Sequence, residues 1–327
     1  MSITKCSFAA LAGAAILATV TTGASAQTTL RSTDIHPTDY PTVEAVRHIS
    51  KLLEERTKGR LKINVFHSAQ LGNEKDTIEQ TRFGVIDLNR INMAPFNNLI
   101  PATNVPSLPF IFRSVAHMRT VMDGPIGDSI LKEFEKHDLI GLAFYDSGSR
   151  SFYNSKRPIT KPDDMKGLKI RVQQSDMFVA LVSALGANAT PMAFGEVYSA
   201  LQTGVIDGAE NNWPSYDSTK HFEVSKFYSM TEHSLSPEVL VMSRRSFDKL
   251  SKEDQDIVKA AARESVKVMR DLWDARETSS EAKVKAGGAV VNAVDKKAFI
   301  DAMKPVYDRF VTDAALKKLV ADIQAVQ

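Results

Sequence analysis

The stretch MKGLKIRVQQ, residues 165–174, has the pattern of a β-strand with one apolar face. Leu168, Ile170 and Val172 alternate with two cations, the second of which is Arg171. This is the two-residue period of a strand whose apolar side enters a core. Cations on the opposite side usually face solvent. The stretch therefore predicts a half-buried strand and raises the question of what Arg171 does.

The first 26 residues have the pattern of a cleaved secretion signal. Lys5 is followed by a largely apolar run over residues 8–20 and then by Ala24-Ser25-Ala26. The run is shorter than the roughly 20 apolar residues that cross a membrane. We therefore expect a signal peptide over residues 1–26, cleavage near Ala26 and Gln27, and a mature protein in the periplasm.

The expected mature chain is nearly neutral and has no cysteine. The only cysteine, Cys6, lies within the expected signal, so no disulfide, thiolate nucleophile or cysteine metal ligand remains. Loss of Lys5 reduces the 41 basic residues by one, against 39 acidic residues. This balance gives no electrostatic reason to expect nucleic acid or an anionic membrane as a partner.

The length and the local patterns predict an α/β protein with two domains. About 300 mature residues exceed the size at which a single core keeps growing. Helical and strand-like patterns alternate along the chain, and Ser251 is placed to cap a long helix that runs to about Ala286. Repeated βα units predict a largely parallel sheet in each domain, with ligands outside the carboxyl ends of the strands.

Local signatures of catalysis are absent from the sequence. It contains no G-x-S-x-G elbow, no P-loop, no G-x-G-x-x-G after a strand and no H-E-x-x-H, and its seven histidines are scattered. We therefore expect a protein that is not an enzyme, with no catalytic residues, no cofactor and no metal site.

Polar side chains follow several of the expected strands. Arg150 comes just after the apolar stretch LIGLAFYD, Arg171 ends MKGLKIR, and Asn211 with Asn212 ends VIDGAENN. A guanidinium offers a rigid fork of donors that matches a carboxylate, and an asparagine amide both donates to and accepts from hydroxyls. The set fits an anion that carries hydroxyls.

The alternative is that these arginines have a structural role. Arg150 and Arg171 would then form ion pairs with acids such as Asp163, Asp164 or Glu196. The pattern alone leaves both interpretations open.

Several motifs in fixed order resemble one transporter family. DDMKGLKIRV, followed by ALGANATPMAFGEVYSALQTGVIDGAENN, closely resembles the solute-binding subunit of tripartite ATP-independent periplasmic (TRAP) transporters of the DctP type. The resemblance implies a two-domain periplasmic binding protein that closes a hinge cleft around an organic acid and delivers it to membrane permease subunits. It also implies that Arg171 is the main carboxylate partner and that Arg150 and Asn211 face the ligand. Asn212 stands where sialic-acid binders often have proline, which argues against sialic acid.

The N-terminal half is expected to supply the other wall of the cleft. His36 and Tyr40 lie just before a helix that begins near Pro41, Glu74 lies near another helix start, and Asn92 follows a strand. By similarity to the family we expect Glu74 to accept from ligand hydroxyls, with His36 and Asn92 next in order. In the alternative interpretation His36 and Tyr40 only shape the turn, and Glu74 only interacts with the positive end of its helix.

Trp213 is the last candidate for ligand contact. It either stacks on a sugar ring or packs at the hinge, and its position beside Pro214 slightly favours packing.

The resemblance also gives expected domain boundaries and a ligand class. Domain I would contain residues 27–147 and 237–275, and domain II residues 148–236 and 276–327, with the long helix as a strut that spans both. The motifs look most like the subgroup that binds hexuronates such as glucuronate or galacturonate. A C4-dicarboxylate, an aldonate or an aromatic acid stays an alternative ligand.

The role of the whole protein also has alternatives. One is a secreted enzyme acting on carboxylated sugars, and another is a sensor subunit that presents its ligand to a receptor. We expect a monomer.

Overall fold

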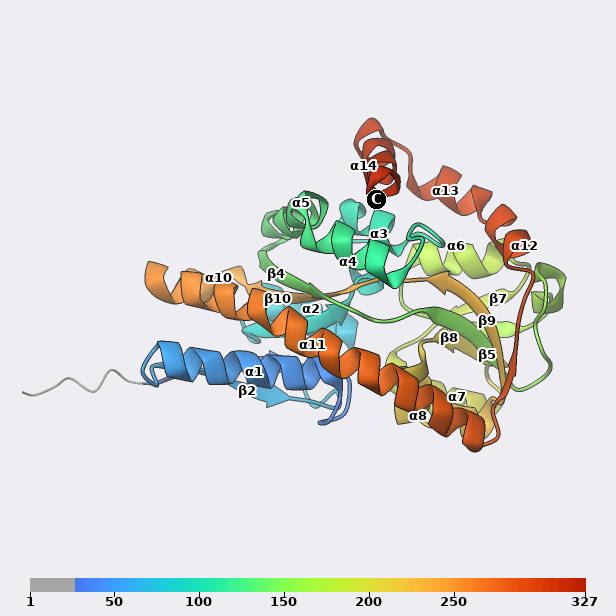
Figure 1. Cartoon of the computed structure of the whole chain (residues 1–327), viewed down its shortest axis with the longest axis horizontal. Coiled ribbons are helices and arrows are strands. Elements are labelled where there is room, and N and C mark those ends of the chain that lie inside the picture. Colours follow the sequence, from blue (N-terminus) through green and yellow to red (C-terminus); the bar gives the residue numbers. More distant parts are fainter. Residues whose placement is uncertain (1–26) are drawn as a thin grey trace, which may run out of the picture.

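The computed structural model describes residues 27–327, so the expected signal peptide lies outside the described residues. Two β-sheets flanked by helices form the molecule (Figure 1). Within the described residues, no helix combines the length and the apolar character needed to cross a membrane. The predicted α/β fold with two sheets and one long helix is confirmed.

The first sheet has five strands and, with its helices, is called the first lobe. Its strands in spatial order are β2 (Leu61–Phe66), β1 (Thr28–Thr33), β3 (Leu88–Asn92), β10 (Glu238–Ser243) and β4 (Leu139–Tyr145). The helices that flank it are α1 (Pro41–Arg56), α2 (Glu74–Arg82), α3 (Asn104–Ser107), α4 (Val115–Asp123), α5 (Pro125–Glu133) and α10 (Arg244–Phe247). Short 3-10 turns at Ala94–Phe96, Pro101–Thr103 and Phe134–His137 connect these elements.

The second sheet has six strands and forms, with its helices, the second lobe. Its strands in spatial order are β11 (Val290–Asn292), β9 (Phe227–Ser234), β5 (Arg150–Asn154), β8 (Gly208–Asn211), β6 (Lys169–Val172) and β7 (Asn188–Pro191). Its helices are α6 (Asp176–Ala184), α7 (Val197–Gln202), α8 (Trp213–Ser218) and α9 (His221–Val224), with 3-10 turns at Pro162–Met165 and Phe194–Glu196.

Each sheet is largely parallel, as predicted, but contains one strand that runs against all the others. β10 lies antiparallel between β3 and β4, and β5 lies antiparallel between β8 and β9. Neither β5 nor β9 is among the strands expected from the sequence. All five residues of β5 are buried, so it has no alternating pattern, while β9 buries polar side chains such as Thr231 and His233. Neither strand carries the periodicity that identifies a half-buried strand.

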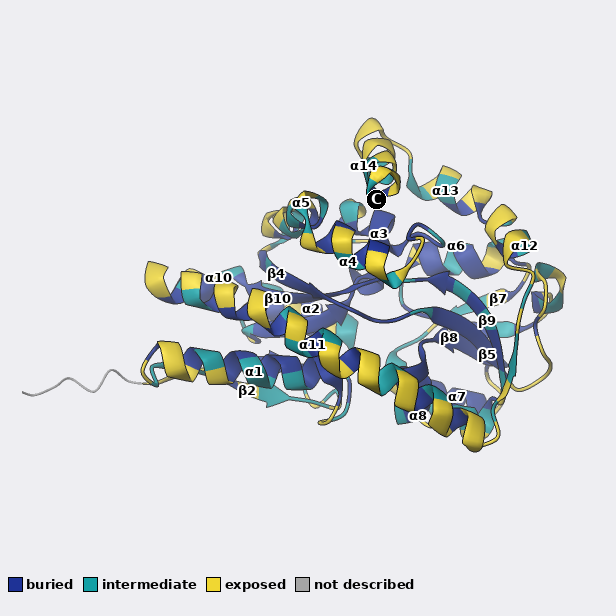
Figure 2. Cartoon of the chain, in the orientation of Figure 1, coloured by how far each residue is buried: buried dark blue, intermediate teal, exposed yellow. Residues whose placement is uncertain are grey.

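The long helix α11 (Lys252–Ala286) connects the two lobes. It packs against α1 and β4 at one end and against α8 at the other, and Figure 1 shows it running along one side of the molecule. Ser251 caps it by accepting from the backbone N–H of Asp254, as predicted. Its 35 residues correspond to about 50 Å. Figure 2 shows buried and exposed residues alternating along it, as in a surface helix.

The chain crosses between the lobes in three further places. The segments after β4 and after β9 lead from one sheet to the other. At the C-terminus, α12 (Lys296–Asp301) contacts β9 and α13 (Lys304–Phe310) contacts α6 of the second lobe, but α14 (Ala314–Ala325) packs on α3 and α5 of the first lobe. Arg113 Nη1 donates to Gln324 O at 2.9 Å, which holds this helix in place. The expected domain II therefore contains a helix that contacts the first lobe.

Candidate ligand-binding site

A buried cavity of about 20 Å³ is lined by side chains of both lobes. The first lobe contributes Ile35, His36, Glu74, Arg90, Asn92 and Glu238, and the second contributes Arg150, Arg171, Gln173, Phe194 and Asn211. Six of the predicted site residues are therefore brought together here: Arg171, Arg150, Asn211, Glu74, His36 and Asn92. A space of this size holds about one water molecule, so a larger ligand requires the lobes to separate.

The strand directions explain why these residues meet. β6 and β8 run parallel, so Arg171 and Asn211 lie toward the same edge of the second sheet. β5 runs antiparallel to β8 and pairs Ser151 with Asn211, so the start of β5 brings Arg150 to that edge too. The prediction of an edge where strands end is thus correct for β6 and β8, whereas Arg150 begins its strand.

Arg171 is buried but has no carboxylate partner. It is 3% exposed, and its Nε and Nη2 both donate to the Met192 carbonyl, at 3.0 and 2.7 Å. Its Cζ lies 5.9 Å from the centroid of the Phe194 ring. Burial lowers the pKa of Arg171, an effect that Glu210 opposes, but an arginine remains charged. Among residues 27–327 no acid forms an ion pair with it, so its charge is available to an anion.

Arg150 is instead neutralised by a neighbour on β8. Its Nη2 donates to Glu210 Oε1 at 2.8 Å and its Nε donates to Glu210 Oε2, while Nη1 donates to Asn211 Oδ1 at 2.8 Å. Burial opposes ionisation of Glu210, but Arg150 and the hydrogen bond to His233 lower its pKa to about 2. The structural alternative is therefore correct for Arg150, although its partner is Glu210 and none of the acids considered from the sequence.

Two of the three acids considered as structural partners, Asp163 and Asp164, are engaged elsewhere. Asp163 pairs with Lys166 at 2.7 Å, and Asp164 accepts from the backbone and hydroxyl of Thr160.

Asn211 accepts from Arg150 and from the backbone of Asn212 through Oδ1. The Asn211 amide nitrogen makes no hydrogen bond within residues 27–327, so it is a free donor at the cavity.

Arg90 at the first-lobe wall was not found by sequence reasoning. It is 1% exposed and donates to Asp34 through Nε at 2.9 Å and through Nη2. Its Nη1 lies 3.2 Å from Glu238 Oε2 and 3.7 Å from Glu74 Oε1. All five residues of β3 are buried. Because β3 also contains Asn89 and Asn92, the local pattern did not mark Arg90 as buried.

The remaining first-lobe candidates have defined partners. Glu74 Oε1 accepts from the backbone N–H of Asn92 at 3.1 Å, and burial raises the pKa of Glu74. Asn92 Oδ1 accepts from the Ala94 backbone, and its Nδ2 lies 3.3 Å from Ser147 Oγ. The pKa of His36 is lowered to about 3, mainly by burial and secondly by the positive charge of Arg90, so this ring is neutral.

Three predicted residues do not line the cavity. Tyr40 stacks on His36 with centroids 3.8 Å apart and bonds through its hydroxyl to Ser215 Oγ at 3.0 Å. Trp213 stacks on Tyr228 at 3.8 Å, which is the packing role favoured by its sequence context. Asn212 caps α8 through Oδ1 and donates to Ser147 O at 2.7 Å. Their polar groups serve packing, capping and contact between the lobes.

A hollow of about 490 Å³ lies next to the cavity and shares Ile35, Glu74 and Phe194 with it. Residues of both lobes line this hollow, among them Ser68 and Asn73 of the first lobe and Tyr198 of the second. The side chains shared by the two spaces separate the cavity from the hollow.

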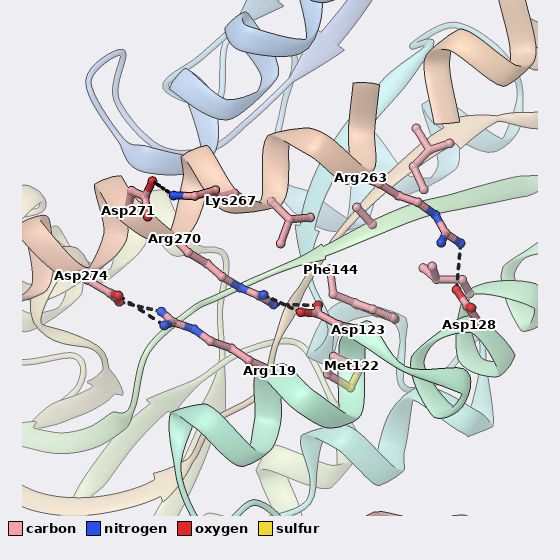
Figure 3. A pocket seen from close by; sticks show the side chains of 14 residues that line it. Arg119, Met122, Asp123, Asp128, Phe144, Arg263, Lys267, Arg270, Asp271 and Asp274 are labelled. Carbon is pink, nitrogen blue, oxygen red and sulfur yellow. Dashed lines mark hydrogen bonds and ion pairs between the residues drawn. The ribbon is translucent and has the colours of Figure 1, made fainter. Parts of the chain in front are cut away.

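Another hollow lies elsewhere, between α4, α5, β4 and α11, with a volume of about 580 Å³. Figure 3 shows that its charged side chains form ion pairs with one another: Arg119 with Asp274, Arg270 with Asp123, Arg263 with Asp128, and Lys267 with Asp271. This hollow offers no free cation comparable to Arg171. Within residues 27–327, no group of three or more His, Cys, Asp or Glu side chains is arranged to hold a metal ion.

The buried free arginine, the hydroxyl-binding groups beside it and the two joined lobes define a carboxylate receptor of the two-lobed binding-protein class. Comparison with known proteins agrees. The family model described as "Bacterial extracellular solute-binding protein, family 7" matches residues 33–313. The chain belongs to this family, the DctP family of TRAP solute-binding proteins, so the resemblance seen in the sequence is confirmed.

Solved structures of relatives contain sugar acids. The chain is 54% identical to a TRAP periplasmic solute-binding protein from Xanthobacter autotrophicus with bound β-D-galacturonate, with a TM-score of 0.90 over 91% of this chain and all of that one. It is 45% identical to one from Chromohalobacter salexigens with bound D-glucuronate, with a TM-score of 0.89 over 91% of this chain and 100% of that one. The 2,3-diketo-L-gulonate-binding periplasmic protein of Escherichia coli is 38% identical over 86% of this chain and 87% of its own length.

Proposed function

We propose that this protein is a receptor for a hexuronate, with D-galacturonate and D-glucuronate as the first candidates. The single observation that carries the proposal is the buried guanidinium of Arg171, which faces the cavity without a carboxylate partner. Leaving a buried charge unpaired is costly, and a ligand carboxylate would remove that cost. The relatives with bound galacturonate and glucuronate support the same ligand class.

The other lining groups suit a hydroxylated ring. Asn211 offers a free amide donor, while the carboxylate of Glu74 accepts from hydroxyls and Glu238 lines the cavity beside it. We assign Arg171 to the carboxylate, and Asn211, Glu74, His36 and Asn92 to the ring. Arg150 is assigned a lining role in which Glu210 holds its guanidinium in place.

The charges of the cavity disfavour the alternative of a C4-dicarboxylate. Arg90 and Arg150 are already paired with acids, so Arg171 is the one lining cation left for an incoming carboxylate among the described residues. A second carboxylate would meet Glu74 and Glu238 and would be repelled. Aldonates and aromatic acids carry one carboxylate and stay in the test set.

The cellular role follows from the family as a proposal. A signal peptide over residues 1–26 would direct the chain to the periplasm, where it would capture the acid and deliver it to TRAP permease subunits. Closure of the two lobes on the hinge, with α11 as the strut, would present the loaded form. Uptake of labelled galacturonate by cells with and without the gene tests delivery, and recovery of chemically unchanged uronate from the protein argues against the enzyme alternative.

A thermal-shift panel on the purified mature protein tests the ligand class. It covers hexuronates, aldonates, C4-dicarboxylates, aromatic acids and neutral sugars. A ligand at 100 times its Kd adds about 2.7 kcal/mol to the stability of the native state. We expect stabilisation by galacturonate or glucuronate and none by galactose or glucose, which lack the carboxylate. A shift with dicarboxylates alone would overturn the hexuronate proposal.

A further inference from the structure

Glu238 is a buried carboxyl at the cavity with an incomplete set of partners. It is the first residue of β10, pairs in the sheet with Asn92 and Tyr145, and is 2% exposed. Its Oε2 lies 3.2 Å from Arg90 Nη1, yet neither atom makes a hydrogen bond. Oε2 therefore has the charge of Arg90 beside it but no hydrogen bond, and the residue lines the cavity.

Arg90 is shared among three carboxyls and cannot satisfy all of them. Asp34 takes Nε and Nη2, and Glu74 lies 3.7 Å from Nη1, the same nitrogen that faces Glu238. Polar and charged groups on several elements interact with the Glu238 carboxyl. On the strands and helices these are Arg90 of β3, Arg150 of β5, Glu74 of α2 and Tyr40 at the start of α1; in the segments after β1 and β4 they are Asp34 and Ser147. Burial raises the pKa of Glu238 to about 7, and Asp34 and Glu74 add to the rise while Arg90 opposes it.

The charge balance of the closed site makes this carboxyl sensitive to ligand. The cations of the site are Arg90, Arg150 and Arg171, all buried, and its acids are buried Asp34, Glu210 and Glu238 with half-buried Glu74. Burial lowers the pKa of both neighbouring imidazoles, His36 and His233. With every acid ionised, the acids outnumber the cations before any ligand arrives. A uronate adds one more negative charge in a region that excludes water, where such repulsion is strong.

We propose that Glu238 binds a proton from solvent when the acid ligand is captured, and that the resulting neutral carboxyl donates a hydrogen bond to a ligand hydroxyl. The inference rests on the proposed function and deepens it by making Glu238 a ligand-binding residue whose proton is part of the complex. Below the pKa of Glu238 the proton is already present, so binding takes up none. Above it, binding requires proton uptake, so affinity falls as pH rises, by up to about tenfold per pH unit.

Calorimetric titration of the wild-type mature chain with D-galacturonate measures this uptake directly. Titrations at about pH 7.5 in two buffers with different heats of ionisation, such as phosphate and Tris, give the number of protons bound with the ligand. We expect uptake of a substantial fraction of one proton and a Kd that rises between about pH 6.5 and about pH 8.5. The sugar carboxylate itself is ionised throughout this range. Binding with no proton uptake and no pH dependence would overturn the inference.

The Glu238→Gln variant assigns the proton to its site. Glutamine imitates the neutral carboxyl, so we expect proton uptake to disappear and affinity at about pH 8.5 to exceed that of the wild type by about tenfold or more. Glu74→Gln is the matched variant at the other carboxyl near Arg90 and should retain proton uptake. If Glu74→Gln removes it and Glu238→Gln does not, the assignment to Glu238 is wrong. Absence of galacturonate and glucuronate binding at every pH would instead contradict the proposed function.

Discussion

The guanidinium of Arg171 is held by the Met192 carbonyl, which accepts from both Nε at 3.0 Å and Nη2 at 2.7 Å. A single backbone oxygen thus fixes the plane of the fork without neutralising its charge. Nη1 and the second hydrogen of Nη2 remain for a carboxylate, which can accept two parallel bonds from them. This geometry explains how a cation is held buried and ready in the absence of an acidic partner.

Replacement of Arg171 by lysine should weaken galacturonate binding by about 10 to 100 times. A hydrogen bond to a charged group contributes about 1.5–3 kcal/mol, and an ammonium cannot reproduce the fork. Calorimetric titration measures the loss. Lys169→Gln is the matched control, because Lys169 lies on the same strand and its Nζ donates to Gly204 O away from the cavity. If Arg171→Lys bound galacturonate as tightly as the wild type, the assignment of Arg171 as the carboxylate partner would be wrong.

Replacement of Glu210 by glutamine should destabilise the fold as well as the site. It removes the charge that neutralises Arg150, and breaking a buried ion pair costs about 3–5 kcal/mol. Urea unfolding of the ligand-free protein measures the loss. Asp128→Asn is the control, since it breaks the exposed pair with Arg263, where a loss of about 0–1 kcal/mol is expected. A Glu210 variant as stable as the Asp128 variant would show that the buried pair is not needed for folding.

Acid should destabilise the protein through its buried histidines. Burial, with Arg171 adding to it, lowers the pKa of His221 to about 3. Between about pH 6.5 and about pH 3 the unfolded chain binds a proton at this residue and the native state does not. The histidine therefore reduces stability by up to about 1.4 kcal/mol for each pH unit below about 6.5.

The measurement is the difference in stability between wild type and His221→Gln as a function of pH. Glu238 has the opposite effect, because its raised pKa reduces stability as pH rises from about 4.5 to about 7. Since both proteins contain Glu238, its contribution cancels in the difference between them. The variant should have a flatter pH profile than the wild type, with the partly exposed His67→Gln as control. Parallel profiles for wild type and the His221 variant would contradict the assignment.

Ligand should close the two lobes. The cavity of about 20 Å³ is too small for a sugar acid to enter, and the lobes touch where Tyr40 meets Ser215 at 3.0 Å and where the Asn97 amide meets the Ser175 hydroxyl at 2.9 Å. These contacts belong to a closed form. We predict a decrease in the radius of gyration in solution scattering when galacturonate is added to ligand-free protein. Identical scattering in both states would argue against a hinge.

The sequence identified the second-lobe side of the site better than the first. Arg171 was found because it interrupts one face of an alternating strand and because its motif resembles a known family. The partner of Arg150 was missed, since Glu210 lies 60 residues away in sequence on a strand that pairs with β5. No strand was expected where β5 lies, so this pairing had no basis in the local pattern.

Burial explains the other differences between expectation and structure. Arg90 has both polar and apolar neighbours in sequence, and its three acids come from separate elements. Tyr40 and Trp213 have the polar and aromatic character of ligand contacts, but both pack against other rings. Local sequence gives the chemistry of a side chain, whereas tertiary packing decides which partner it meets.

The most direct test of the account is a crystal structure of the mature chain with D-galacturonate. The account predicts the sugar carboxylate about 2.7–2.9 Å from the Nη atoms of Arg171, with ring hydroxyls toward Glu74 and Glu238. Arg150 should stay paired with Glu210. A carboxylate bound elsewhere, with Arg171 still lacking an acidic partner, would contradict the central claim that this buried guanidinium is the anion site.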